Sequence, residues 1–238
     1  MKPSLEDRVL AFLDQLPRST KINLGRPEVK PGEKQADYLL DEGRVVVEVK
    51  TLKQTQRWRG EAVLDEYLTY TGSKIFGSLP LSRIAMSSEH LAALEKSISS
   101  RMTRGIEKVC RSANHQIGDE LGRLPHLATG TLILINENVP DLHPRLVADR
   151  VVEFTLSKRT NIHYCLLIFE SHLVKVRNRS VPYPLLLDLT YSARQRRAGR
   201  FLRVIKEKWA MENGLPSGLP DPEPIELDYQ PGSLTLGR

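Results

Sequence analysis

Apolar residues recur every three or four positions in four segments of the chain, and this spacing predicts four helices. The segments are residues 4–16, 89–121, 144–157 and 192–211. Ser4 can cap the first helix, because a serine side chain accepts a hydrogen bond from a backbone N–H of the first turn. The second segment is much the longest, and the last combines its apolar stripe with many basic residues.

Two β-rich runs on either side of a glycine-containing turn predict a hairpin. The runs are residues 35–40 and 45–50, and the turn between them is Asp41-Glu42-Gly43-Arg44. Counting outward from the turn pairs Leu39 with Val46.

Two further apolar runs, residues 131–135 and 162–169, are typical of buried strands, and the second pattern continues to Val176. Residues 18–34 leave room for one short strand at most, and residues 53–87 follow no clear period. The order of helix, hairpin, long helix, strand, helix and strand predicts an α/β domain.

The chain has 238 residues, 40% of them hydrophobic, which is enough for one sizeable core. We assign residues 1–213 to this domain and residues 214–238 to a Pro/Gly-rich acidic tail. The tail could compete with nucleic acid for the basic body, be inert, or add an edge strand. No apolar run could span a membrane, the N-terminus does not resemble a signal peptide, and the two cysteines are far apart. We therefore expect a cytoplasmic protein with no membrane partner.

The net charge of the chain is +6, and the acidic tail makes the remaining residues more basic still. A basic body favours a polyanionic partner, because neutralising phosphates supplies most of the non-specific affinity for nucleic acid. Solubility alone is the simpler explanation of a mild positive charge.

The hairpin register also places two acidic residues side by side. Asp37 faces Glu48, and Lys50 lies one step along on the same strand face. The opposite face is predicted to be the core face: Ala36, Tyr38, Leu40, Val45, Val47 and Val49. Like charges about 5 Å apart are destabilising unless something neutralises them, and Mg²⁺ would do so. The alternative is a half-exposed strand face on which these charged residues pair with their neighbours.

Asp37, ten residues, and then Glu48-Val49-Lys50 on an apolar strand together resemble the PD-(D/E)XK nuclease superfamily, which includes many restriction enzymes and DNA-repair nucleases. The order of elements over residues 4–136 also resembles its restriction-endonuclease-like core, which has the order α-β-β-β-α-β and a central mixed sheet flanked by helices. Ala36 stands where the family pattern has proline.

The resemblance implies that Asp37 and Glu48 are metal ligands and that Lys50 is the catalytic lysine. Some members of the family add a glutamate from the first helix, for which Glu6 is the candidate, and a polar residue from the later helix, where Gln116 fits. A first-turn glutamate also stabilises a helix through its dipole, so Glu6 has a purely structural alternative.

Two further groups of residues could contact nucleic acid. Arg57-Trp58-Arg59 follows the hairpin, where a loop could meet substrate, and an aromatic between arginines can stack on a base. Tryptophan is equally common as a core anchor. Residues 194–208 contain seven basic side chains. Three of them lie on one helix face: Arg196, Arg200 and Arg203. This row suits phosphate contacts, although many charge runs are simply solvated faces.

We therefore expect a metal-dependent nuclease, that is, a hydrolase that cuts phosphodiester bonds of nucleic acid. DNA is the favoured substrate, and we expect an endonuclease. Asp37, Glu48 and the Val49 backbone carbonyl would hold Mg²⁺ or Mn²⁺, and Lys50 would position the attacking water. A second copy of the chain or another protein is a further expected partner. The competing hypothesis is a non-catalytic nucleic-acid-binding or assembly subunit that retains the nuclease fold.

Overall fold

The computed structural model describes residues 3–22, 34–54, 57–74, 81–124, 128–139, 142–157, 160–170, 173–176, 179–182, 185–190 and 196–213. Its helices are α1 (Leu5–Gln15), α2 (Arg57–Thr71), α3 (Leu81–Ile84), α4 (Ser88–Leu121), α5 (Pro144–Ser157) and α6 (Arg196–Glu212). Its strands are β1 (Thr20–Lys21), β2 (Tyr38–Leu40), β3 (Val45–Thr51), β4 (Thr129–Asn136), β5 (Tyr164–Phe169), β6 (Leu173–Val176), β7 (Arg179–Pro182) and β8 (Leu185–Thr190).

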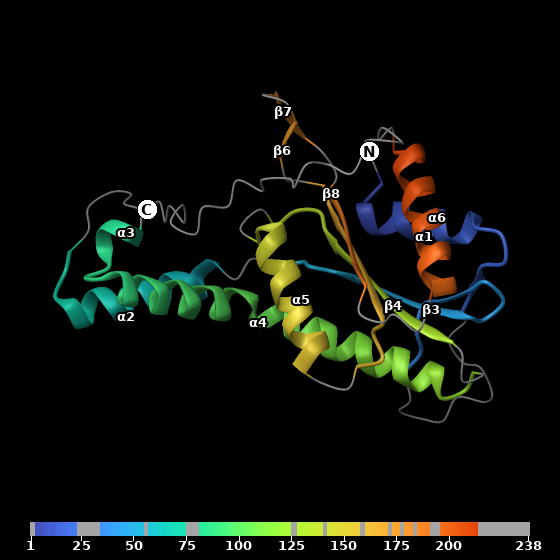
Figure 1. Cartoon of the computed structure of the whole chain (residues 1–238), viewed down its shortest axis with the longest axis horizontal. Coiled ribbons are helices and arrows are strands. Elements are labelled where there is room, and N and C mark those ends of the chain that lie inside the picture. Colours follow the sequence, from blue (N-terminus) through green and yellow to red (C-terminus); the bar gives the residue numbers. More distant parts are fainter. Residues whose placement is uncertain are drawn as a thin grey trace.

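Six strands form one mixed sheet in the order β1-β2-β3-β4-β5-β8. The central strands β3, β4 and β5 are parallel, and the outer pairings are antiparallel. Every residue of β4 and of β5 is buried, as is usual for parallel strands covered on both faces. The α/β class with a mixed sheet flanked by helices is therefore confirmed (Figure 1).

Helices cover both faces of this sheet (Figure 1). On one face α1 and α6 pack on β2 to β5, and Phe12 meets Trp209 edge to face at a centroid distance of 5.3 Å. On the other face α4 and α5 pack over Val46, Leu132 and Leu134. The hairpin face that carries Tyr38 and Val47 is a core face as predicted, but Ala36 packs in the cluster on the α4 side instead, and Val46 of the second face is buried there as well.

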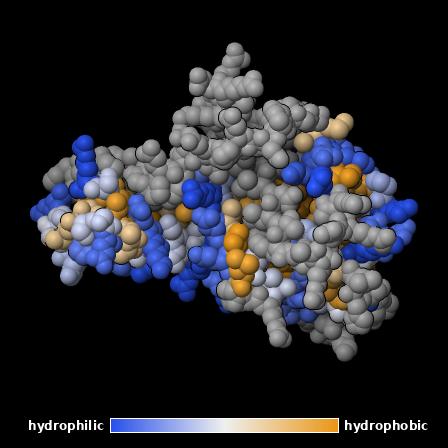
Figure 2. Space-filling view, viewed as in Figure 1, coloured by the Kyte–Doolittle hydropathy of each residue, from blue (hydrophilic) through white to orange (hydrophobic). Residues whose placement is uncertain are grey.

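The long helix α4 serves two cores. Its C-terminal half packs on the sheet, while its N-terminal half extends beyond the sheet and carries α2 and α3, as Figure 1 shows. A separate cluster joins Val63 and Leu64 of α2 to Ile98 and Met102 of α4. A Cβ on Gly60 would lie 3.1 Å from Met102, so glycine lets the two helices approach closely. In Figure 2 hydrophilic residues cover most of the described surface of this face, and hydrophobic residues show mainly in small patches.

The structure confirms the four predicted helices and corrects three other expectations. The poorly patterned stretch 53–87 contains α2 and α3. The β5 pattern does not continue to Val176, because β6 pairs with β7 in a separate two-stranded sheet. The sheet edge beyond β5 is β8, an antiparallel strand that the sequence pattern did not identify. Residues 214–238, which were assigned to the acidic tail, lie outside the described residues.

Ser4 caps α1 as predicted, since its side chain accepts a hydrogen bond from the Asp7 N–H at 3.1 Å. None of the helices in the described ranges has an apolar stretch that would span a membrane.

Candidate active site

The hairpin has the register that the sequence predicted. Tyr38 pairs with Val47, Leu39 with Val46 and Leu40 with Val45. The turn that sets this register contains three residues with positive φ, including Gly43 at +82°. Asp37 lies just before the first paired residue of β2, and its carboxyl is within hydrogen-bonding reach of the Glu48 carboxyl, so the two predicted neighbours do meet.

Backbone hydrogen bonds hold Asp37 at the edge of β3. Its N–H donates to the Val47 carbonyl at 3.0 Å, and its own carbonyl accepts from the Ile22 N–H at 2.9 Å. Its side chain accepts a hydrogen bond from the Val49 N–H, with 2.7 Å between the nitrogen and Oδ2. These bonds therefore fix the Asp37 carboxylate just before β2 begins, beside the part of β3 that continues past it.

Glu48 is completely buried, with 0% of its surface exposed. Its Oε1 forms an ion pair with the Nζ of Lys50, whose side chain is 26% exposed. Among the described residues its Oε2 accepts no hydrogen bond from an N–H or hydroxyl donor, and the neighbouring Asp37 carboxyl can hydrogen-bond to Glu48 only when one of the two is protonated. A buried carboxylate oxygen without a partner is costly, so this atom is a vacant acceptor aimed into the site.

The surroundings disfavour a negative charge on Glu48. Burial first and the charge of Asp37 second raise the pKa of Glu48 to about 7, although the Lys50 ammonium opposes both. Burial also raises the pKa of Asp37, against the lowering effects of the Val49 N–H and the Lys50 charge. Hydrogen bonding between the two carboxyls favours a proton on Glu48 and a charge on Asp37. Without a cation, the two carboxyls therefore tend to hold one proton between them, and Lys50 balances the remaining negative charge.

These residues fit a divalent cation. Mg²⁺ and Mn²⁺ prefer oxygen ligands, and the site offers the Asp37 carboxylate and the unpartnered Glu48 Oε2. The Val49 carbonyl points to the same strand edge as the Val49 N–H, which is the edge where Asp37 lies. A cation bound here would favour the charged forms of both carboxyls and so oppose the burial that raises both pKa values.

Glu6 lies at the border of this site. Its Oε2 accepts a hydrogen bond from the Thr51 hydroxyl at 2.8 Å and lies 3.4 Å from the Lys53 ammonium. Its charge contributes to the raised pKa of Asp37. Within the described ranges, however, no three His, Cys, Asp or Glu side chains are grouped to hold a metal, so Glu6 does not complete a three-carboxylate set with Asp37 and Glu48.

Gln116 acts on the backbone that leads into the site. Its side-chain amide on α4 donates to the Gln35 carbonyl at 2.8 Å, two residues before Asp37, and its Oε1 accepts from Ser112 at 3.3 Å. It therefore positions the start of β2, and these contacts are structural.

The structure decides the open alternative for Trp58, which was either a core anchor or a stacking residue. Arg57-Trp58-Arg59 forms the first turn of α2 rather than a loop. Trp58 is 60% exposed, and the Arg59 guanidinium lies over its ring at 5.0 Å, so Trp58 is no core anchor. The Arg57 side chain lies outside the described part of the structure.

The basic helix α6 lies on the face of the sheet opposite α4. On this helix Ile205 and Trp209 are buried in the core against the sheet, whereas Arg203 is exposed. The side chains of Arg196 and Arg200 lie outside the described residues. The structure therefore does not bring this helix together with the cations of α4.

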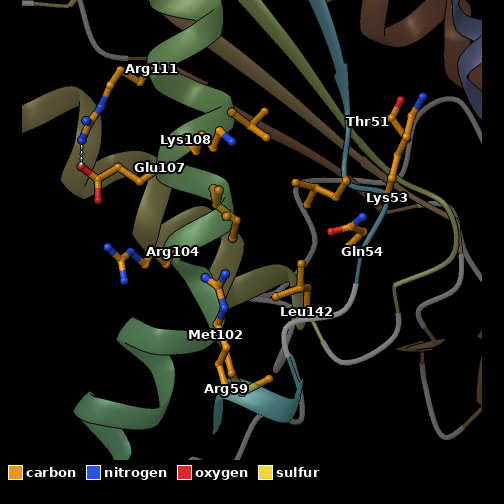
Figure 3. Close-up of a pocket in the computed structure, with 14 residues that line it drawn as sticks. Thr51, Lys53, Gln54, Arg59, Met102, Arg104, Glu107, Lys108, Arg111 and Leu142 are labelled. Atoms are coloured by element: carbon orange, nitrogen blue, oxygen red, sulfur yellow. Dashed lines mark hydrogen bonds and ion pairs between the residues drawn. The ribbon is translucent and has the colours of Figure 1, made fainter.

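A cleft of about 880 Å³ lies between the end of β3 and the middle of α4 (Figure 3). Its cationic lining residues are Lys53, Arg59, Arg104, Lys108 and Arg111. These α4 cations were not identified as a site from the sequence. The spacing of Arg104, Lys108 and Arg111 puts them on one helix face, and this pattern in the sequence could have indicated a cationic site.

Comparisons with protein-family models, curated proteins and solved structures gave no match. The functional assignment therefore depends on the geometry of the chain itself.

Proposed function

We propose that this protein is a metal-dependent nuclease that hydrolyses phosphodiester bonds, with DNA as the favoured substrate. One observation carries the proposal: the fully buried Glu48 lies beside Asp37 and in contact with Lys50, and one of its carboxylate oxygens accepts no N–H or hydroxyl hydrogen bond within the described part of the chain. A protein that needed these residues only for stability would have little reason to keep two carboxyls and an unmatched buried oxygen together.

The topology is consistent with this proposal. The helix α1 precedes three antiparallel strands, and β4 follows α4 and lies parallel to β3. Apart from α2 and α3, which are inserted between β3 and α4, this order is consistent with the α-β-β-β-α-β core of the PD-(D/E)XK superfamily, which the sequence around Glu48 resembles. Fold alone does not imply function, so the order supports the proposal only together with the site.

Asp37, Glu48 and the Val49 carbonyl would hold the cation. When bound, a divalent cation polarises a phosphoryl oxygen and makes a nearby water more acidic. Lys50 reaches the site from β3 and is partly exposed, so its ammonium can orient the attacking water or the scissile phosphate. In the hydrolysis the water oxygen bonds to phosphorus while the P–O bond to the leaving sugar oxygen breaks.

The test is a cleavage assay on labelled single- and double-stranded DNA and RNA, with Mg²⁺ or Mn²⁺ and with EDTA. We expect cleavage that EDTA abolishes and that Glu48→Gln reduces by several orders of magnitude. Glu207→Gln removes the same charge from an exposed position of α6 and should retain full activity.

A wild-type chain that cuts none of these substrates with either metal would overturn the proposed nuclease. If such a chain still bound nucleic acid, the non-catalytic binding or assembly subunit would be the better description.

A further inference from the structure

The cleft beside α4 has two chemically different parts. Its floor is apolar and includes Leu52, Met102, Ile106 and Leu142. Its rim is cationic, with Lys53 on the β3 side and Arg104, Lys108 and Arg111 along α4 (Figure 3). A nucleotide strand has the complementary division, because its bases are flat and weakly polar while each phosphate carries a negative charge.

Most of the rim charge is available for a ligand. Arg59, Arg104 and Lys108 form no ion pair with any described residue, and Arg104 and Lys108 are exposed. The one acidic lining residue, Glu107, is bonded to Arg111 at 2.6 Å and to Arg150 at 2.8 Å. The cleft therefore keeps a clear positive excess.

The α4 row has the length of a short stretch of nucleic acid. Arg104 and Arg111 are seven residues apart on α4, which corresponds to about 10 Å along the helix axis. Stacked nucleotides of one strand advance by about 3.4 Å each, so the row spans about three phosphates. A single strand can follow such a row along one cleft wall.

An exposed aromatic residue stands at the α2 end of the cleft. Arg59 lines the cleft and lies over the Trp58 ring, and the rest of that ring is open to solvent. An aromatic side chain stacks on a base whose face is free, which is the case in single strands but not inside a duplex. The stacking platform therefore favours a single-stranded ligand.

We propose that this cleft binds single-stranded polynucleotide, with Trp58 and Arg59 stacking on a base and the α4 cations binding the phosphates. The cleft begins at Thr51, the residue after Lys50, so a bound strand lies next to the candidate active site. This inference rests on the proposed nuclease function for its role in catalysis, and it makes single strands, or single-stranded regions, the preferred substrate.

Binding is measured by fluorescence anisotropy in EDTA, with the full-length Glu48→Gln variant so that no cleavage intervenes. The probes are labelled dT20, rU20 and a 20-base-pair DNA duplex. We expect at least one single strand to bind 10-fold or more tightly than the duplex. The comparison of dT20 with rU20 distinguishes DNA from RNA.

Trp58→Ala should weaken single-strand binding by roughly 5- to 150-fold, the range that corresponds to losing one base–aromatic stack. Tyr70→Ala is the matched control, because Tyr70 is 84% exposed at the other end of α2 and lies away from the cleft lining. Arg104→Glu combined with Lys108→Glu should lower the salt dependence of log K by about 1.4, since each phosphate contact contributes about 0.7. Lys96→Glu, an exposed charge on the same helix, should change neither quantity.

Equal or tighter binding to the duplex would overturn the inference, as would wild-type single-strand affinity in both the Trp58 variant and the double α4 variant. Circular dichroism and melting temperature check that each variant is folded. Because binding is measured without metal, its outcome is separate from that of the cleavage assay. A chain that binds single strands through the cleft and cuts nothing refutes the nuclease alone, and a chain that cuts but binds independently of the cleft refutes this inference alone.

Discussion

Replacing Glu48 with glutamine should stabilise the protein in a pH-dependent way. The pKa of Glu48 rises from 4.5 to about 7 on folding. The folded protein therefore holds the Glu48 proton more tightly than the unfolded chain, and stability falls as the pH rises from about 4.5 through 7. At about 1.4 kcal/mol for each pH unit between the two values, ionised Glu48 costs the folded state about 3 kcal/mol.

Glutamine has nearly the same shape and no charge, so the variant escapes this cost. Relative to the wild type, its free energy of unfolding should increase by about 3 kcal/mol between pH 4.5 and pH 8. For a chain of this size the change corresponds to about 6–12 °C in melting temperature. The cause is the removal of a buried charge that faces Asp37.

The measurement is urea denaturation in EDTA at pH 4.5 and pH 8, for the wild type and for Glu48→Gln. Comparing the two proteins at each pH cancels the titration of all other carboxyls. Glu207→Gln, which changes an exposed glutamate of α6, should follow the wild type at both pH values. Stability curves of Glu48→Gln and wild type that stay parallel from pH 4.5 to pH 8 would refute the reasoning.

Metal should reverse the effect in the wild type. At pH 8, Mn²⁺ at about 100 times its dissociation constant should stabilise the folded wild-type protein by about 2.7 kcal/mol. The Glu48→Gln variant should gain much less, because the carboxylate that balances the ion is gone. Equal stabilisation of both proteins by Mn²⁺ would place the metal elsewhere.

Three other variants test separate parts of the structure. Asp37→Asn should abolish metal-dependent cleavage in the labelled-substrate assay while leaving the fold intact or slightly more stable, and full activity would contradict the assignment of this ligand. Gly130→Ala should destabilise the protein by about 1–3 kcal/mol or more in urea denaturation, because the new Cβ would lie 2.0 Å from the Asn161 carbonyl oxygen; an unchanged midpoint would contradict this packing. Replacing three arginines of α6 with glutamate should weaken binding to nucleic acids of all sequences alike and flatten the salt dependence of that binding. An unchanged salt slope would mean that α6 is only a solvated face. The three arginines are Arg196, Arg200 and Arg203.

The sequence alone was sufficient for the hairpin and for the pairing of its two acids. Strand side chains alternate with a period of two, and a short turn allows few registers, so the Leu39–Val46 register and the closeness of Asp37 to Glu48 follow from local pattern. The same is true of α1, with its Ser4 cap, and of α4, whose apolar period runs for more than 30 residues. Local periodicity and capping are encoded within each segment.

The sequence did not predict which elements cover each other. The α2 segment has little amphipathic pattern, because it packs on α4 partly through Gly60 and along a small separate core. The strand β8 was overlooked because its partner β5 precedes it by about 20 residues, with the β6–β7 hairpin between them. Such contacts depend on residues distant in the chain, which a local period does not report.

Tertiary structure also decided the chemistry of the site. One interpretation of the residue pattern put Glu48 on a half-exposed strand face, but packing of α4 over that face buries Glu48 completely and raises its pKa. The cleft likewise exists only because the end of β3 meets the middle of α4, which makes Lys53 line the same cleft as Arg104 and Lys108. Burial and electrostatic environment are properties of the whole assembly of elements, because they depend on what excludes water from each side chain, and no single segment of the sequence contains that information.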